Sequence, residues 1–280
     1  MNDERLLELR GALQVSARQV VHCPPHLLDG SAIRCFGFDV DEPEPVRRRK
    51  IPGGTIKIVF ALDGIFDGVR RDPSALVVGM HDRGTTATHS GRMRSVQVQL
   101  DPLTARRLLG VPLHELRNTA LPLDQFLGRS ARDLAERLAE TPRWEARFGL
   151  VAEYLRRQAP LGEADSAVTE AVARLRDHRG ALPVSRLVAE SGWSRRHFSR
   201  RFADHVGLPA RTYASLLRFS ATLTAMARSP AGPRDLGRMA DRLGYYDQSH
   251  LIRDFRRFAG TSPSTLLREA MAQSSNTTGR

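Results

Sequence analysis

The chain has few cysteines, few lysines and few aromatic residues for its 280 residues. Its two cysteines, Cys23 and Cys35, cannot form a disulfide framework, and they lack the spacing and the companion ligands of a zinc site. No run of about 18 apolar residues suggests a membrane span, and no basic segment followed by an apolar one suggests a signal peptide. We therefore expect a soluble, cytoplasmic protein that has neither a metal nor a cofactor.

Positive charge is abundant but is concentrated at one end of the chain. The formal net charge is +12, and residues 167–272 carry 18 arginines against 9 acidic residues. Residues 1–166 carry 24 basic and 22 acidic groups and are close to neutral. A generally arginine-rich composition would also give a basic protein, but the asymmetry between the two halves favours a polyanion as the partner.

The most informative stretch, residues 182–267, contains the same helical unit twice. The copies read VSRLVAESGWSRRHFSRRFADHVGLP and DLGRMADRLGYYDQSHLIRDFRRFAGTSP. In each copy a helix leads through a glycine, Gly192 or Gly244, and an aromatic residue to a second helix with a basic outer face. This arrangement predicts a helix-turn-helix. Two of them in tandem predict a chain that reads two segments of DNA.

The second helix of each unit has polar residues opposite its apolar face. Helical periodicity places Phe198 and Phe202 inward and Arg196, Ser199 and Arg200 outward in the first unit. In the second unit the outward residues that we expect to read bases are Gln248, Ser249, Ile252 and Arg253. Arginine can bind guanine in a bidentate manner, and an outward isoleucine suits a thymine methyl group. The arginines expected at phosphates are Arg195, Arg201, Arg218, Arg256 and Arg257.

Residues 210–226 between the two units are predicted to form one helix, roughly 25 Å long. A rigid connector of this length can hold two recognition helices about one DNA turn, roughly 34 Å, apart. Because the two outward faces differ in residue type, we expect one chain to read two unlike half-sites, not a palindrome.

The second unit also carries a family signature. The segment MADRLGYYDQSHLIRDFRRFAGTSPSTL, with its G-Y-x-D-Q-S-H-x-x-R-x-F-R-R-x-x-G-x-S-P pattern, resembles the AraC/XylS family of bacterial transcription regulators, and the likeness covers about a third of the chain. It implies two helix-turn-helix units that bind consecutive major grooves, and base-reading roles for Arg196, Ser199, Arg200, Gln248, Ser249 and Arg253. Val188 departs from the family, which commonly has alanine at this close helix contact, so the first unit should pack more openly.

The first half of the chain reads as strands followed by helices. Alternating residues at 32–40, 55–62 and 93–100 and an apolar run at 75–80 predict short strands, which suggest a sandwich or a small barrel. After Pro102, apolar residues three and four positions apart predict helices that cover the sheet.

Two segments of this half should interrupt the strands. Prolines within residues 41–45 should end the first strand, because proline lacks the donor that a ladder needs. The basic run at 47–50 should form a solvated edge or loop, or alternatively contact an anion.

The segments GVPLHEL and LPLDQFLG, which follow the strands, are similar to sensory domains of some actinobacterial members of the family. That resemblance implies an effector-binding or dimerising module and names no ligand. We expect an α+β chain with a sensory and dimerisation domain at 1–160, a linker at 161–166, a DNA-binding domain at 167–272 and a disordered tail at 273–280. The first domain should be a β-sandwich or barrel-like sheet with covering helices. The second should be all-α, with two helix-turn-helix units.

The expected function is transcriptional regulation through sequence-specific binding of double-stranded DNA. A small-molecule effector of unknown identity or homodimerisation would control it through the first domain, and RNA polymerase is a further candidate partner. We expect no enzymatic activity, since the sequence lacks a glycine-rich phosphate loop of the usual form, a nucleophile elbow and an H-E-x-x-H pair. Two alternatives stay open: a DNA-binding domain fused to a repair-type enzyme, which would need a reactive cysteine, and a non-specific architectural DNA binder.

Overall fold

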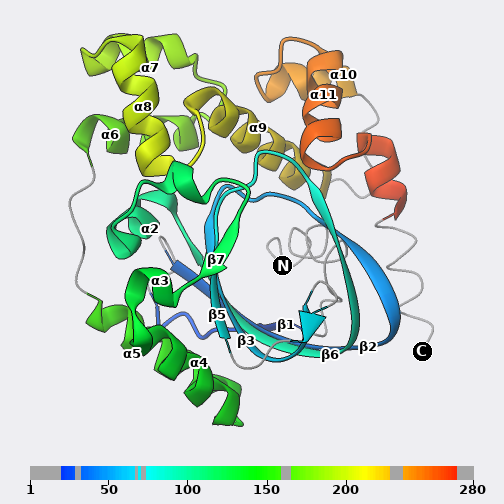
Figure 1. Cartoon of the computed structure of the whole chain (residues 1–280). Coiled ribbons are helices and arrows are strands. Elements are labelled where there is room, and N and C mark those ends of the chain that lie inside the picture. The colour runs from blue at the N-terminus through cyan, green and yellow to red at the C-terminus, as the bar shows by residue number, and fades with distance from the viewer. Residues whose placement is uncertain are drawn as a thin grey trace.

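The structure, a computed structural model, describes residues 20–28, 33–66, 69–70, 74–158, 165–227 and 236–269. The expected tail at 273–280 and most of the expected linker at 161–166 lie outside these ranges. The described residues form a sheet-rich amino-terminal part with covering helices and an all-helical carboxy-terminal part (Figure 1). This confirms the α+β architecture, while the domain boundaries themselves stay predictions.

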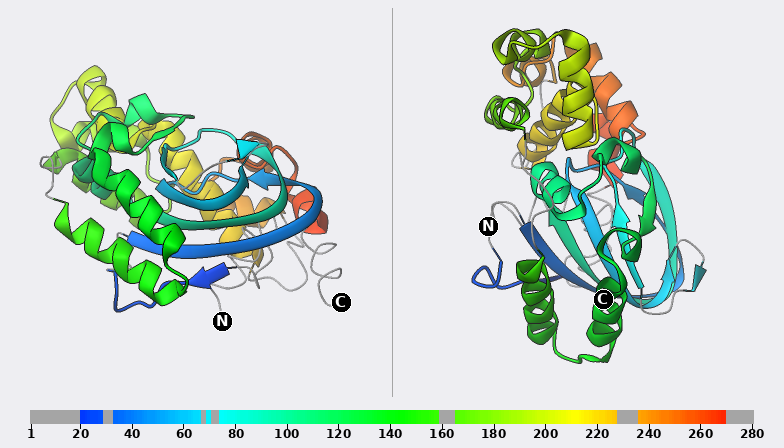
Figure 2. Two further views of the ribbon diagram at one scale, coloured as in Figure 1. Left: turned by 60° about the horizontal axis from the view of Figure 1, so that its bottom comes forward. Right: turned by 60° about the vertical axis from the view of Figure 1, so that its left-hand side comes forward.

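An antiparallel sheet forms the centre of the amino-terminal part. Its strands are β1 (Val20–His22), β2 (Ile33–Lys50), β3 (Ile56–Phe66), β4 (Val69–Arg70), β5 (Ser74–Val78), β6 (Thr85–Leu100) and β7 (Ala120–Pro122). They are ordered β1-β2-β6-β3-β5-β7, and β4 pairs with β3. The long strands β2 and β6 curve together, which gives the sheet the barrel-like shape expected from the sequence (Figures 1 and 2).

Strand β2 is longer than the sequence predicts. We expected the prolines within residues 41–45 to end it, but it continues to Lys50. Its ladder with β6 pairs Glu42 with Gly91, shifts register, and resumes where Val46 pairs with His89. Because the prolines fall within this bulge, they do not have to donate ladder hydrogen bonds. The basic run at 47–50 is therefore part of a strand and not a loop.

Helices close one face of the sheet. They are α2 (Pro102–Leu109), the short 3-10 helix η2 (Leu113–Leu116), α3 (Asp124–Leu127), α4 (Arg129–Glu140) and α5 (Trp144–Arg157). Helix α4 packs on β3 and β5 through an apolar stripe that includes Leu134 and Leu138. The facing positions Ile56, Ile58 and Val77 are completely buried, so this layer is the core of the amino-terminal part.

The carboxy-terminal part is a bundle built on one long helix. Its helices are α6 (Ser166–Asp177), α7 (Val184–Ser191), α8 (Arg195–Val206), α9 (Ala210–Ala227), α10 (Leu236–Arg242) and α11 (Gln248–Phe258). A short helix over 263–269 follows. No helix among the described residues is both long and apolar enough to cross a membrane.

Helix α9 provides core residues for both helical units. Near its start, Tyr213 packs against Phe202 of α8, with ring centroids 6.0 Å apart. Further along, Phe219 contacts Phe255 and Phe258 of α11, at 4.9 and 5.3 Å. Because aromatic rings bury large apolar areas, these contacts fix α8 and α11 on the same helix.

Candidate nucleic-acid interface

Side-chain caps determine where the two second helices begin. The Ser194 hydroxyl accepts a hydrogen bond from the His197 backbone N–H at 3.3 Å, at the start of α8. The Asp247 carboxylate accepts one from the His250 backbone N–H at 2.6 Å, at the start of α11. Each cap satisfies a backbone donor that the first helical turn leaves without a partner. The two helices therefore start at equivalent places in the repeated sequence.

The outer face of α8 has the composition predicted for a recognition helix. Arg196, Ser199 and Arg200 are all exposed. Phe198 and Phe202, on the opposite side, are completely buried and pack on each other with ring centroids 5.7 Å apart. The structure thus brings the three predicted base-reading residues of the first unit onto one exposed surface.

Helix α11 repeats this division with different side chains. Gln248, Ser249 and Arg253 are exposed, while Leu251 and Phe255 are completely buried. The remaining predicted base reader, Ile252, is half-buried. An apolar side chain at the margin of a polar surface has the chemistry required to contact a thymine methyl group.

The five arginines predicted at phosphates have different environments. Arg195 and Arg256 are exposed next to the outer faces of α8 and α11. Arg201 donates to the Asp165 carboxylate at 3.1 Å, and Arg218 donates to the Gly180 carbonyl oxygen at 2.5 Å. Arg257 also has a partner within the chain, described next. The phosphate roles stay predictions, and in this conformation three of the five guanidinium groups are already engaged.

The carboxyl end of α11 docks onto the amino-terminal domain. Arg257 Nε donates to the Asp82 carbonyl oxygen at 2.8 Å, and the Gly84 backbone N–H donates to the Arg257 carbonyl oxygen at 3.0 Å. The Asp82 carboxylate accepts hydrogen bonds from Arg117 and Asn118. Burial would raise the pKa of Asp82, but these hydrogen bonds outweigh it and hold the pKa below its ordinary value. A charged carboxylate therefore faces the end of a recognition helix.

Helix α8 docks in a comparable way. It packs against α2 and η2 of the amino-terminal domain. The His114 ring Nδ1 lies 2.9 Å from an Asp204 carboxylate oxygen. Both recognition helices thus have exposed outward residues near their amino ends and carboxyl ends that rest on the amino-terminal domain. Sequence reasoning missed Asp82, Asn118 and His114, because no local pattern indicates contacts with residues so distant along the chain.

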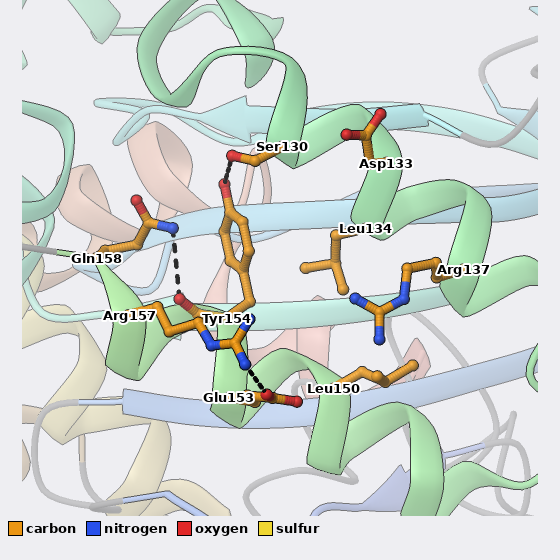
Figure 3. Close-up of a pocket in the computed structure, with 9 residues that line it drawn as sticks. All are labelled: Ser130, Asp133, Leu134, Arg137, Leu150, Glu153, Tyr154, Arg157 and Gln158. Atoms are coloured by element: carbon orange, nitrogen blue, oxygen red, sulfur yellow. Dashed lines mark hydrogen bonds and ion pairs between the residues drawn. The ribbon is translucent and has the colours of Figure 1, made fainter.

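A hollow of about 320 Å³ lies between α4 and α5, at the end of the molecule opposite α7 and α8 (Figures 1 and 3). Tyr154 points across it and contacts the Ser130 hydroxyl at 3.3 Å. Its lining contains Arg137 and Arg157 together with Asp133 and Glu153, and Arg157 pairs with Glu153, so the charges balance. No group of His, Cys, Asp or Glu side chains in the described part of the chain could hold a metal ion. The hollow is separate from the surface formed by α8 and α11.

Comparison with known protein families agrees with this geometry. Residues 187–269 match a family described as a helix-turn-helix domain, and residues 21–122 match a domain of unknown function, DUF6597. No match was found among functionally curated proteins.

Solved structures of ToxT from Vibrio cholerae are similar to the chain at low identity. One has 10% sequence identity and a TM-score of 0.46, and the match covers 85% of this chain and 99% of ToxT. A second, ToxT from Vibrio cholerae O395 bound to (E)-4-(8-methylnaphthalen-1-yl)but-3-enoic acid, has 10% identity and a TM-score of 0.45, with coverage of 86% and 100%.

The repeated units and the matched family define a DNA-binding protein of the helix-turn-helix class. The helix-turn-helix domain is of the AraC type, which confirms the resemblance found in the sequence. The chain is therefore a DNA-binding transcriptional regulator with an AraC-type domain at its carboxyl end.

Proposed function

We propose that one chain reads an asymmetric DNA site, with α8 and α11 in adjacent major grooves. The observation that supports this proposal is the pair of exposed polar faces on two helices whose opposite faces are completely buried. An α-helix fits the major groove, where its outward side chains can distinguish all four base pairs. Helix α9 has 18 residues and spans about 27 Å, which suits a separation of roughly one DNA turn.

The two units would prefer different sequences. Arg196 and Arg200 of α8 favour guanines, because a guanidinium group can donate to both acceptors on the guanine edge. On α11, Gln248 favours adenine and Ile252 favours thymine, next to Arg253. The arginines Arg195 and Arg256 would neutralise phosphates and fix the register without reading sequence.

Alanine substitutions test the base-reading assignment. Arg200→Ala and Arg253→Ala should each weaken binding to the preferred site by about 1–3 kcal/mol and relax base preference at one position. The matched control is Arg195→Ala, a predicted phosphate contact on the same helix as Arg200. It should weaken all sequences to a similar extent and reduce the salt dependence by about one counterion.

Binding to the preferred site and to random DNA would be titrated at the same salt concentration. Equal losses on both DNAs for Arg200→Ala and Arg253→Ala would contradict the assignment. A wild-type protein that binds both DNAs equally would instead be an architectural DNA binder.

Control through the amino-terminal domain is the second part of the proposal. Its support is the docking of this domain on the carboxyl ends of both recognition helices, through Asp82 at α11 and His114 at α8. A small molecule or a second copy of the chain could bind the amino-terminal domain and shift it. Such a shift would change the position of α8 and α11 relative to DNA. A change in contact with RNA polymerase would then alter transcription.

A further inference from the structure

We propose that Arg218 is a positioning residue that fixes the distance and the rotation between the two helix-turn-helix units. This inference rests on the proposed reading of two grooves by one chain. Arg218 lies on α9, and its Nη1 donates to the Gly180 carbonyl oxygen at 2.5 Å while its Nη2 donates to the Ser215 hydroxyl at 3.1 Å. Its guanidinium carbon lies 5.5 Å from the centre of the Tyr245 ring. One side chain on the connecting helix thus contacts the turn that leads into the first unit and a residue of the second unit.

The contacted segments are the turns that lead into α7 and into α11. Gly180 lies in the turn between α6 and α7, which leads into the first unit. Tyr245 follows the turn between α10 and α11, two residues before the Asp247 cap. A displacement of Tyr245 would therefore move the start of the second recognition helix directly.

The turn at Gly180 and the turn at Gly244 also pack so closely that neither glycine has room for a Cβ atom. A Cβ atom at Gly244 would lie 2.5 Å from the Ala181 Cβ, and one at Gly180 would overlap the Ala214 carbonyl oxygen. Both glycines have positive φ, +75° and +77°, a conformation that suits glycine. The turn that leads into the first unit, the turn of the second unit and α9 therefore meet at a close-packed junction, so α9 is not the sole link between these parts.

A buried carboxylate extends this junction into the second recognition helix. Asp254 of α11 is 6% exposed, and its Oδ2 has no hydrogen-bond partner among the described residues. Arg218 Nε is buried and likewise finds no hydrogen-bond partner there. The positive charge of Arg218 acts on both Asp254 and His250 of α11. Arg218 thus packs on Tyr245, just before α11, and its charge acts on two residues of that helix.

A fixed junction between the two units should restrict the spacing between the half-sites that the chain binds. Each base pair added between two half-sites moves them roughly 3.4 Å apart and rotates them by roughly 35°. Units joined only by one flexible connection would tolerate such changes, whereas units locked at a shared junction would not. We therefore expect Arg218 to enforce a narrow spacing preference, rather than to bind a phosphate.

The experiment compares full-length variants on sites of different spacing. A preferred site is first selected from random DNA by the wild-type chain, and the segment between its half-sites is then lengthened or shortened by one or two base pairs. The wild type should lose about tenfold or more in affinity on each altered site, and Arg218→Met should reduce this penalty to about threefold or less. The base preferences within each half-site should stay unchanged.

Arg218→Lys and Arg211→Met test whether the effect depends on the hydrogen bonds of Arg218 and not on charge or folding. Arg218→Lys keeps the charge but cannot bind Gly180 and Ser215 while stacking on Tyr245, so it should also broaden the spacing preference. If Arg218→Met fails to fold, this variant decides. Arg211→Met changes an exposed arginine on the same helix and should leave the spacing preference as in the wild type.

A phosphate contact would give a different pattern. Arg218→Met would then lose affinity to the same extent on every spacing, Arg218→Lys would lose less, and both would keep the wild-type spacing preference, which would overturn the inference. A wild-type chain that selects no site at all would refute the proposed function itself, so the two failures are distinguishable.

Discussion

Asp254 is a single buried carboxylate whose ionisation should make stability depend on pH. Burial raises its pKa to about 6, although Arg218, Arg257 and Arg253 act in the opposite direction. The ordinary value, expected in the unfolded chain, is 3.8. Between these two values the folded state binds more protons than the unfolded state, so this group makes the free energy of unfolding fall as pH rises from about 4 to about 6. Above about pH 6, the ionised Asp254 lowers the free energy of unfolding by a constant amount.

Asp254→Asn should remove this cost. We expect the variant to have a free energy of unfolding about 1–3 kcal/mol above that of the wild type at pH 8, and an equal one near pH 4. Denaturant unfolding of the full chain across this pH range measures the difference. The exposed Asp241→Asn on α10 is the control and should show no such trend. A variant that is less stable than the wild type at pH 8 would show that the carboxylate stabilises the fold.

At the start of α11, two neighbouring residues have different roles: one stabilises the helix and the next is proposed to read a base. Asp247 caps the helix, and the next residue, Gln248, is exposed at its tip. Asp247→Ala should lower the free energy of unfolding by about 1 kcal/mol, because a backbone donor loses its partner. Gln248→Ala should change it by no more than about 0.5 kcal/mol.

Thermal and denaturant unfolding, together with DNA titration, measure both quantities for the two variants. Gln248→Ala should relax base preference despite its small effect on stability. Equal stability losses for Asp247→Ala and Gln248→Ala would contradict the assignment of Asp247 as the cap.

The helical elements were largely predictable from local patterns. Helices were expected after Pro102, and α4 and α5 form there because apolar residues recur at helical spacing. The outward faces of α8 and α11 follow from the same periodicity. The length of β2 was not predictable, since the bulge that accommodates its prolines depends on pairing with β6, about 50 residues later.

The partners of the arginines could not be predicted either. Arg201, Arg218 and Arg257 were assigned to phosphates because arginines on a basic helical surface commonly contact DNA. Their hydrogen-bond partners in the fold, Asp165, Gly180 and Asp82, come from segments at least 36 residues away. Only the packing of domains and turns brings them together, and no local pattern encodes it.

At the scale of the whole molecule, the docking of the two domains should oppose DNA binding. Arg257 Nη2 lies 3.8 Å from the Asp82 carboxylate, so a phosphate proposed to bind Arg257 would compete with this carboxylate. Asp82→Asn removes that competing charge and weakens the hold of the amino-terminal domain on α11. We expect about a fivefold gain in DNA affinity and a salt dependence that rises by about one counterion.

DNA titration of the full chain at several salt concentrations tests this expectation. Asp124→Asn, which removes a carboxylate paired with Arg132 within the amino-terminal domain, is the matched control and should leave binding unchanged. A loss of affinity for Asp82→Asn would mean that docking presents α11 to DNA and does not restrain it.

One chain should read two unlike half-sites with its two recognition helices. The most direct test is selection of bound sequences from random DNA by the purified full-length protein, followed by titration of the selected site and of random DNA at one salt concentration. We predict one asymmetric consensus, with two different half-sites about one helical turn apart and at least about 10³-fold tighter binding than to random DNA. A palindromic consensus, or no enriched sequence, would contradict the claim.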